Sequence, residues 1–309
     1  MTVKDLWGLV KAAVSGWIGD YAPSMGAALA YYTLFSIAPL LLIVISIAGL
    51  VFGEEAARGE IFSQLEDLLG APGALAVQGL LESVRKPSES VAATAFGVVL
   101  LLIGATSVFG ELQDALDRIW RAPVRAGHSG IWGLIRARLL SFGMILGVGF
   151  LLMVSLVASA ALAALRKWWG TALGDWAVAV SVIEVGSSFL VITVVFAMIY
   201  KIMPRVRIDW KDVWIGAAAT ALLFTVGKFL IGVYIGRSGI ASGFGAAASL
   251  VAVLAWVYYS AQIFLLGAEF TWAYAHRFGS RKDLAPEAAP AVPYPAIPSS
   301  IPTKAPRER

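Results

Sequence analysis

The sequence predicts an all-α integral membrane protein with six transmembrane helices and both termini in the cytoplasm. Three observations support this prediction: six long apolar stretches, a low content of charged residues, and basic residues that fall mainly in alternate gaps between the stretches. Hydrophobic residues make up 59% of the chain and charged residues 14%, against about 45–50% and about 25% in soluble domains. A soluble chain of 309 residues has no interior large enough for six such stretches.

Each apolar stretch is long enough to cross a bilayer, because a helix needs about 20 residues to span a hydrocarbon core of about 30 Å. The first three stretches contain no Asp, Glu, Lys or Arg, and the last three contain one each. The predicted spans are residues 27–52, 91–110, 139–165, 176–200, 213–235 and 246–274. Together they predict one six-helix membrane domain over residues 27–275.

The basic residues predict the orientation of the spans. Of the 24 Lys and Arg residues, 17 lie in the N-terminal segment, the second and fourth gaps (111–138 and 201–212) and the C-terminal tail. Six lie in the other gaps, and Lys228 lies inside a span. By the positive-inside rule, both termini and these two gaps face the cytoplasm. An even number of spans agrees with termini on the same side.

Residues 1–26 precede the first span and contain an amphipathic segment. Apolar residues recur at helical spacing from Val3 to Ile18, with Lys4 and Lys11 on another face. Two placements fit this pattern: a helix on the inner membrane surface, or a helix packed on the cytoplasmic ends of the bundle. Because the segment lacks the apolar core and cleavage site of a signal peptide, we expect the first span to direct insertion.

The first span and the gap after it contain prolines that affect helix geometry. Pro39 lies near the middle of the span and predicts a kink. The acidic gap 53–90 has helical periodicity that Ala71-Pro72-Gly73 interrupts. We expect two short helices there, forming a hairpin over the outer face of the bundle. A structural cap is favoured over a lid on a cavity.

Two further segments are predicted to lie in the cytoplasm. Residues 110–121 contain Asp–Arg pairs at i,i+4 spacing and predict a helix that continues beyond the second span until Pro123. Residues 276–309 contain seven of the 13 prolines of the chain. This composition predicts a disordered proline-rich tail, because it cannot bury enough apolar surface to fold.

Charges inside spans are the main candidate site. Glu184 lies about 12 Å and Lys228 about 10 Å from the outer ends of consecutive spans, at a rise of 1.5 Å per residue. Opposite charges at matching depth predict a pair that binds a charged substrate or relays protons. The alternatives are an ion pair that only fixes helix register, and a Lys228 side chain that reaches out to the interface.

The secondary candidates lie in the last and the first spans. Glu269 is near the inner end of the last span, and we expect it to cap a helix or pair with cytoplasmic basic residues rather than contact a substrate. The candidates in the first span are Tyr31, Tyr32 and Pro39.

The inventory of reactive residues is poor for an enzyme. The chain has no cysteine, which excludes disulfides, thiolate chemistry and a cysteine metal site. His128 and His276 are too far apart for a spaced metal-ligand motif, and no hydrolase, nucleotide-binding or metalloprotease motif stands in a suitable context. We therefore expect no catalytic residues, no metal, no cofactor, no enzymatic activity and no nucleic-acid partner.

Several segments in order resemble the YihY/BrkB family of bacterial inner-membrane proteins. They are AALAYYTLFSIAPL (27–40), GELQDALDRIW (110–120), YKIMPRVRIDWKD (200–212), GKFLIGVYI (227–235) and WVYYSAQIFLLGAEFT (256–271). The resemblance covers roughly residues 10–275. One departure is Asp117, where the family pattern leads us to expect asparagine, and the proline-rich tail lies outside the pattern.

The resemblance implies six membrane helices in the bacterial cytoplasmic (inner) membrane and a largely unknown activity. Members have been labelled ribonuclease BN, a misassignment, and virulence factor, and another branch has been linked to lipid export. We therefore expect a transporter or lipid-translocating protein, with the bilayer as partner and a lipid or small charged molecule as substrate. The alternative is a non-transporting scaffold or envelope-integrity protein whose intramembrane charges only specify packing. A ribonuclease is strongly disfavoured, and the oligomeric state is not predicted.

Overall fold

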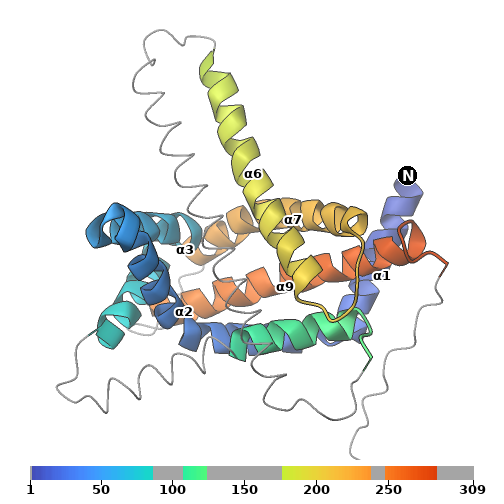
Figure 1. Ribbon diagram of the computed structural model, residues 1–309, viewed down its shortest axis with the longest axis horizontal. Helices are drawn as coiled ribbons and strands as arrows, with labels where there is room; N and C mark the ends of the chain where they lie inside the picture. Colours follow the sequence, from blue (N-terminus) through green and yellow to red (C-terminus); the bar gives the residue numbers. More distant parts are fainter. Residues whose placement is uncertain (1, 86–106, 124–175, 238–247, 284–309) are drawn as a thin grey trace, which may run out of the picture.

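The computed structural model describes residues 2–85, 107–123, 176–237 and 248–283, and all regular secondary structure among them is helical (Figure 1). The helices are α1 (Val3–Gly19), α2 (Ala22–Phe52), α3 (Glu54–Arg85), α6 (Trp176–Ile202), α7 (Trp210–Arg237) and α9 (Ala248–Arg277). Residues 107–119 form a further helical segment. The predicted spans 91–110 and 139–165 and the predicted tail lie mostly outside the described residues, so six spans stay a prediction.

Helix α9 is the central element of the described bundle. It contacts α1, α2, α3 and α7, whereas α6 contacts α7. Figure 1 shows α7 and α9 lying side by side across the molecule with opposite chain directions, and α1 crosswise at the end where α9 terminates. The Trp176 end of α6 projects away from the other described helices.

Three of the described helices are long and apolar enough to cross a membrane. The qualifying stretches are Val185–Ile202 in α6, Trp210–Ile231 in α7 and Leu250–Arg277 in α9. They coincide with the last three predicted spans. Exposed apolar side chains such as Leu222, Phe229 and Leu230 on α7 agree with a surface in contact with lipid tails.

The amphipathic pattern near the N-terminus forms α1, which begins with a capping box between Thr2 and Asp5. One face of α1 packs on the bundle, with Leu9 and Ala13 buried. The apolar side chains of the predicted stripe are mostly exposed: Val3, Leu6, Trp7, Val10, Val14 and Ile18. Packing on the bundle therefore uses a different face from the apolar stripe.

The predicted break at Ala71-Pro72-Gly73 is wrong, because α3 runs through these residues as one continuous helix instead of two short ones. A proline inside a helix removes one backbone hydrogen bond and favours a bend, and it ends the helix only where nothing else supports the backbone. Helix α3 packs against α2 and α9. The connection from α2 is the single residue Gly53, whose φ of 86° suits glycine.

Small residues bring α7 and α9 close together. A Cβ atom at Gly216 would overlap the Thr271 side chain, and a Cβ atom at Gly267 would overlap Thr220 and the Tyr200 hydroxyl. The Thr220 and Thr271 hydroxyls each donate a 2.7 Å hydrogen bond to a carbonyl four residues earlier on their own helix. The two helices are therefore in close contact, and the threonine hydroxyls between them are hydrogen-bonded, as in many membrane helix pairs.

Replacing Gly267 with alanine should destabilise the protein. Alanine in a helix interior is normally better than glycine by about 0.5–1 kcal/mol. At Gly267 the added methyl group would overlap the Thr220 side chain and the Tyr200 hydroxyl, so these side chains would have to move. Overpacking of this kind costs about 1–3 kcal/mol. Gly79→Ala in α3 is the control, because nothing lies within 4 Å of a Cβ atom there. Thermal unfolding in detergent measures both variants, and equal stabilisation by the two changes would refute the close contact.

Candidate functional site

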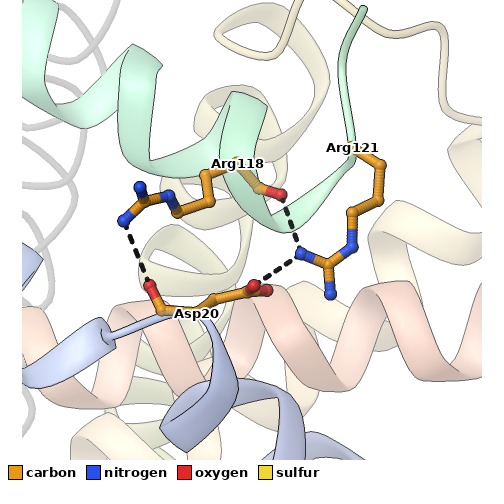
Figure 2. A network of polar contacts seen from close by, with 3 residues as sticks. All are labelled: Asp20, Arg118 and Arg121. Carbon is orange, nitrogen blue, oxygen red and sulfur yellow. Dashed lines mark hydrogen bonds and ion pairs between the residues drawn. The ribbon is translucent and has the colours of Figure 1, made fainter. Parts of the chain in front are cut away.

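A group of buried and partly buried charges, here called the charged junction, lies where three parts of the chain meet. It consists of Asp20, between α1 and α2; Arg118 and Arg121, in and just after the helical segment 107–119; and Glu269, about two turns before the end of α9. Figure 2 shows Asp20 between the two arginines. Residues far apart in the sequence therefore share one buried polar site.

An ion pair joins Asp20 to Arg121. The distance from Arg121 Nη1 to Asp20 Oδ1 is 2.5 Å, and the two side chains are only 15% and 6% exposed. The same Nη1 atom donates to the Arg118 carbonyl oxygen at 3.3 Å, and Arg118 donates to the main-chain oxygen of Asp20 at 3.5 Å (Figure 2). The pair is thus held at both ends by further hydrogen bonds.

Glu269 adds a second carboxyl group to the charged junction. It is 1% exposed. Its carboxyl group packs against Gly16 of α1, where a Cβ atom would overlap it. It also lies close enough to Asp20 and Arg121 to interact with the charges of both. Glycine at position 16 therefore lets α1 lie directly on a buried carboxyl group of α9.

The backbone is strained on both sides of the Asp20–Arg121 pair. Tyr21 has a φ of 59° and Arg121 a φ of 53°, and they are the non-glycine residues with positive φ in the described part of the chain. Such conformations cost about 1–3 kcal/mol and cluster at functional sites. Arg121 occupies the C′ position of a Schellman cap, since its N–H bonds to the Arg118 carbonyl and that of Ala122 to the Asp117 carbonyl. Glycine is usual there.

Several polar atoms at and near the charged junction have no hydrogen-bond partner among the described residues. At the charged junction these atoms are Asp20 Oδ2 and Glu269 Oε1. The indole N–H groups of Trp17 and Trp120 and both amide atoms of Gln262 are also buried without a partner there. Gln262 precedes Glu269 by seven residues and so lies on the same face of α9. Unpaired polar atoms thus extend from the charged junction along α9.

A second set of contacts ties the helical segment 107–119 to the connection between α6 and α7. Asp117 accepts a 2.7 Å hydrogen bond from the Arg205 backbone N–H, and Arg205 Nε lies 3.3 Å from its carboxylate. Gln113 donates to the Met203 carbonyl oxygen at 2.9 Å. Burial raises the pKa of the Asp117 carboxyl group above its usual range, although Arg205 acts in the opposite direction.

A third set closes the same end of the bundle after α9. Ser280 donates to Asp212 Oδ2 through its N–H at 3.1 Å and through its hydroxyl at 2.6 Å. Arg281 donates to the Arg207 carbonyl oxygen at 2.8 Å and lies 5.4 Å from the Trp120 ring centre. Segments from all four regions that the positive-inside rule assigns to the cytoplasm therefore meet at one end of the molecule.

The main predicted pair is not brought together among the described side chains. Lys228 is exposed on α7. Glu184 belongs to the N-terminal part of α6, and its side chain lies outside the described residues. The Trp176 end of α6 points away from α7 in Figure 1. The pairing of Glu184 with Lys228 stays a prediction.

The secondary candidates have different environments. Tyr31 and Tyr32 are exposed on α2, and Tyr31 makes edge-on ring contacts with Tyr32 at 5.7 Å and Phe35 at 5.0 Å. Helix α2 continues through Pro39, whose side chain lies outside the described residues. Glu269 lies beside Arg121, a basic residue of a predicted cytoplasmic segment, and also beside Asp20, which the sequence analysis did not single out.

The described residues form a cavity and include possible metal ligands. A small cavity of about 90 Å³ lies between α2 and α3, lined by Leu42, Ile45, Ser46, Glu54, Arg58 and Leu81. It is remote in sequence from the predicted spans 176–200, 213–235 and 246–274. Among the described residues, no group of three or more His, Asp or Glu side chains could hold a metal ion.

Replacing Arg121 with glycine should destabilise the protein although glycine suits the backbone. Glycine removes the strain of the left-handed backbone conformation, which stabilises the folded state by about 1–2 kcal/mol. Loss of one partner of a buried ion pair destabilises it by about 3–5 kcal/mol. We expect the free energy of unfolding to fall by roughly 2 kcal/mol. The control is Arg58→Ala, which breaks a 3.8 Å pair with the largely exposed Glu82 and should cost less than about 1 kcal/mol. A stabilised Arg121→Gly variant in chemical denaturation would contradict the role of the pair.

Replacing Asp117 with asparagine should preserve or raise stability at neutral pH. A raised pKa means that the folded state disfavours the charged carboxylate, and an amide oxygen can still accept from the Arg205 N–H. Wild-type stability should fall relative to the variant as pH rises from about 3.9, the ordinary aspartate value, through the raised value. Below the ordinary value the two should converge. The free energy of unfolding of both proteins, measured across this pH range, tests the prediction. A wild type that is more stable than the variant at neutral pH would contradict it.

Comparison with known proteins agrees with the membrane character of the chain. The family described as virulence factor BrkB matches residues 13–292. A UPF0761 membrane protein of Psychrobacter sp. (strain PRwf-1) is 25% identical over 266 residues, covering 85% of this chain and 47% of that protein. A UPF0761 membrane protein of Pseudomonas aeruginosa (strain LESB58) is 29% identical over 261 residues, covering 82% of this chain and 59% of that protein.

The relatives differ in length. The UPF0761 membrane protein of Tolumonas auensis is 27% identical over 259 residues, which cover 82% of this chain and 80% of that protein. The chain thus spans about half to three fifths of the Psychrobacter and Pseudomonas relatives. No solved structure matches. With the family match over most of its length, and with helices long and apolar enough to cross a membrane, this chain belongs to the BrkB family of membrane proteins.

Proposed function

We propose that this chain is a transporter or lipid-translocating protein of the bacterial inner membrane. The observation that supports the proposal best is the buried carboxyl group of Glu269, which lies within the membrane-spanning stretch of α9 beside Asp20 and Arg121. Ionisable groups in spans are energetically expensive, and they usually mark the path of a substrate or an ion. The amide of Gln262, which has no hydrogen-bond partner among the described residues, continues this polar face along α9.

The proposed orientation places the charged junction at the cytoplasmic side, within a six-span, N-in and C-in topology. The gathering of the basic segments at one end of the bundle supports this orientation. Helix α1 then lies against the inner leaflet, with its exposed apolar stripe toward the lipid. Lys4 and Lys11, which are also exposed, lie near anionic headgroups.

The proposed substrate is a lipid or a small charged molecule, and no catalytic step or nucleic-acid partner is part of the proposal. Lys228 is exposed on α7 near Leu230 and Phe229, which are also exposed. An ammonium group in this position suits a phosphate or carboxylate on an amphiphile that moves along the protein surface. Glu184 on α6 remains its proposed partner.

The second candidate is a scaffold or envelope-integrity protein that transports nothing. The close packing of α7 on α9 through Gly216 and Gly267 favours it, because such an interface holds helices in one arrangement. Under this alternative, the buried charges only specify which helices meet.

Charge-removing variants in a deletion strain separate the two candidates. If the protein transports, Glu269→Gln and the double variant Glu184→Leu/Lys228→Leu should be inserted at normal levels yet fail to restore the envelope lipid composition of the wild type. Their amide or apolar side chains can neither bind a charged headgroup nor exchange a proton. Glu82→Gln, at an exposed position on α3, is the control and should complement fully. Full complementation by folded variants would favour the scaffold.

A direct assay tests lipid translocation. The purified protein is reconstituted into liposomes that carry a fluorescent phospholipid in both leaflets, and an impermeant reductant bleaches the outer leaflet. We expect the wild type to expose the inner-leaflet probe as well, and the double variant to do so at least about tenfold more slowly, equivalent to about 1.4 kcal/mol in the barrier. Bleaching that stops at the outer leaflet in wild-type liposomes would contradict lipid translocation.

A further inference from the structure

If every group is ionised, the charged junction holds two carboxylates and two guanidinium groups, but only Arg121 interacts with the carboxylates through its side chain. Asp20 and Glu269 would contribute two negative charges, and Arg121 is the cation whose side chain interacts with both. Arg118 donates to the main-chain oxygen of Asp20 and not to its carboxylate. One of the two carboxylates would thus lack a cationic side chain of its own, in a site where both carboxyl groups are at least 94% buried. Burial of an unpaired charge is strongly unfavourable, and the usual remedy is a proton.

The carboxyl oxygens without a hydrogen-bond partner among the described residues support the same conclusion. Asp20 and Glu269 are close enough to interact, and two ionised carboxylates are acceptors only, so they can form a hydrogen bond with each other only if one of them carries a proton. Asp20 Oδ1 accepts from Arg121, whereas Asp20 Oδ2 and Glu269 Oε1 have no other partner in the described part of the chain. An O–H group on either carboxyl would satisfy an otherwise unpaired atom.

We propose that Asp20 and Glu269 form a proton-binding site that holds one exchangeable proton between them. In the described residues, the charged groups that face it are Asp20 from the α1–α2 connection, Arg118 and Arg121 from the segment after residue 107, and Glu269 from α9. Release breaks one carboxyl O–H bond. The proton passes to water, and the electron pair remains on the oxygen as a carboxylate.

Proton release changes the forces between helices. With the proton, the Asp20–Glu269 hydrogen bond joins the α1–α2 connection to α9. Without it, two carboxylates repel each other and compete for the single Arg121 side chain, whose strained backbone limits where it can move. The protonation state of the site therefore controls how strongly the connection after α1 is held to α9. Resting on the proposed transport function, the inference identifies the coupling ion as a proton.

Infrared spectroscopy of the full-length protein in lipid nanodiscs tests the proposal without any transport assay. A protonated carboxyl group has a carbonyl-stretch band separate from that of a carboxylate. We expect a band of one buried carboxylic acid that disappears on titration from mildly acidic to strongly alkaline pH. Isotopic labelling of glutamate and of aspartate in the wild type assigns the band, so the result does not depend on a variant that folds. A spectrum without such a band at any pH would overturn the proposal.

Variants test the charge count. Glu269→Gln and Asp20→Asn each leave one carboxylate for Arg121, so both should lose the band at neutral pH. Arg121→Gln removes the cation, so its band should grow because two carboxyl groups then need protons. Glu82→Gln should leave the spectrum unchanged. A band that survives both Glu269→Gln and Asp20→Asn would assign the proton elsewhere and refute the site, whether or not transport is observed.

Discussion

The ion pair between Arg121 and Asp20 joins parts of the chain that are far apart in the sequence. Asp20 sits at the only break between α1 and α2, and Arg121 ends the helical segment 107–119. With Glu269 beside them, the start of the chain, its middle and its last described helix converge on one buried point. Because each of these charges is stable there only in the presence of the others, the arrangement is cooperative. The strained backbone at Tyr21 and Arg121 shows that local preferences yield to this constraint.

Away from the charged junction, the described bundle is held by shape rather than charge. Lipid tails are as apolar as leucine, so helices in a membrane gain little from hydrophobic burial and more from close contact. The α7–α9 interface follows this rule through Gly216 and Gly267, and the Tyr200 hydroxyl extends it to α6 with a 2.7 Å hydrogen bond to the Phe264 carbonyl. The two modes of association divide the molecule into a rigid apolar part and a charged end.

The sequence predicts the helices of the apolar part because length and hydropathy are local properties. The stretches that form α6, α7 and α9 could be identified without a structure, and so could the amphipathic α1. The continuity of α3 through Pro72 could not, because contacts with other helices decide whether a proline ends a helix. Arg121 and Asp20 are 101 residues apart, and no spacing rule connects them. One usable signal was an arginine where a helix end normally has glycine.

The docking of α1 on α9 has a consequence for biosynthesis. Gly16 and Glu269, which touch in the finished protein, are separated by most of the chain. At translation rates of about 5–20 residues per second, the ribosome needs roughly 10–50 s to make the second after the first. During this interval the surface of α9 on which α1 packs has not yet been made. A nascent chain that ends before the last span never forms this surface. A product truncated before the last span would therefore lack the α9 surface on which α1, with its buried Leu9 and Ala13, packs.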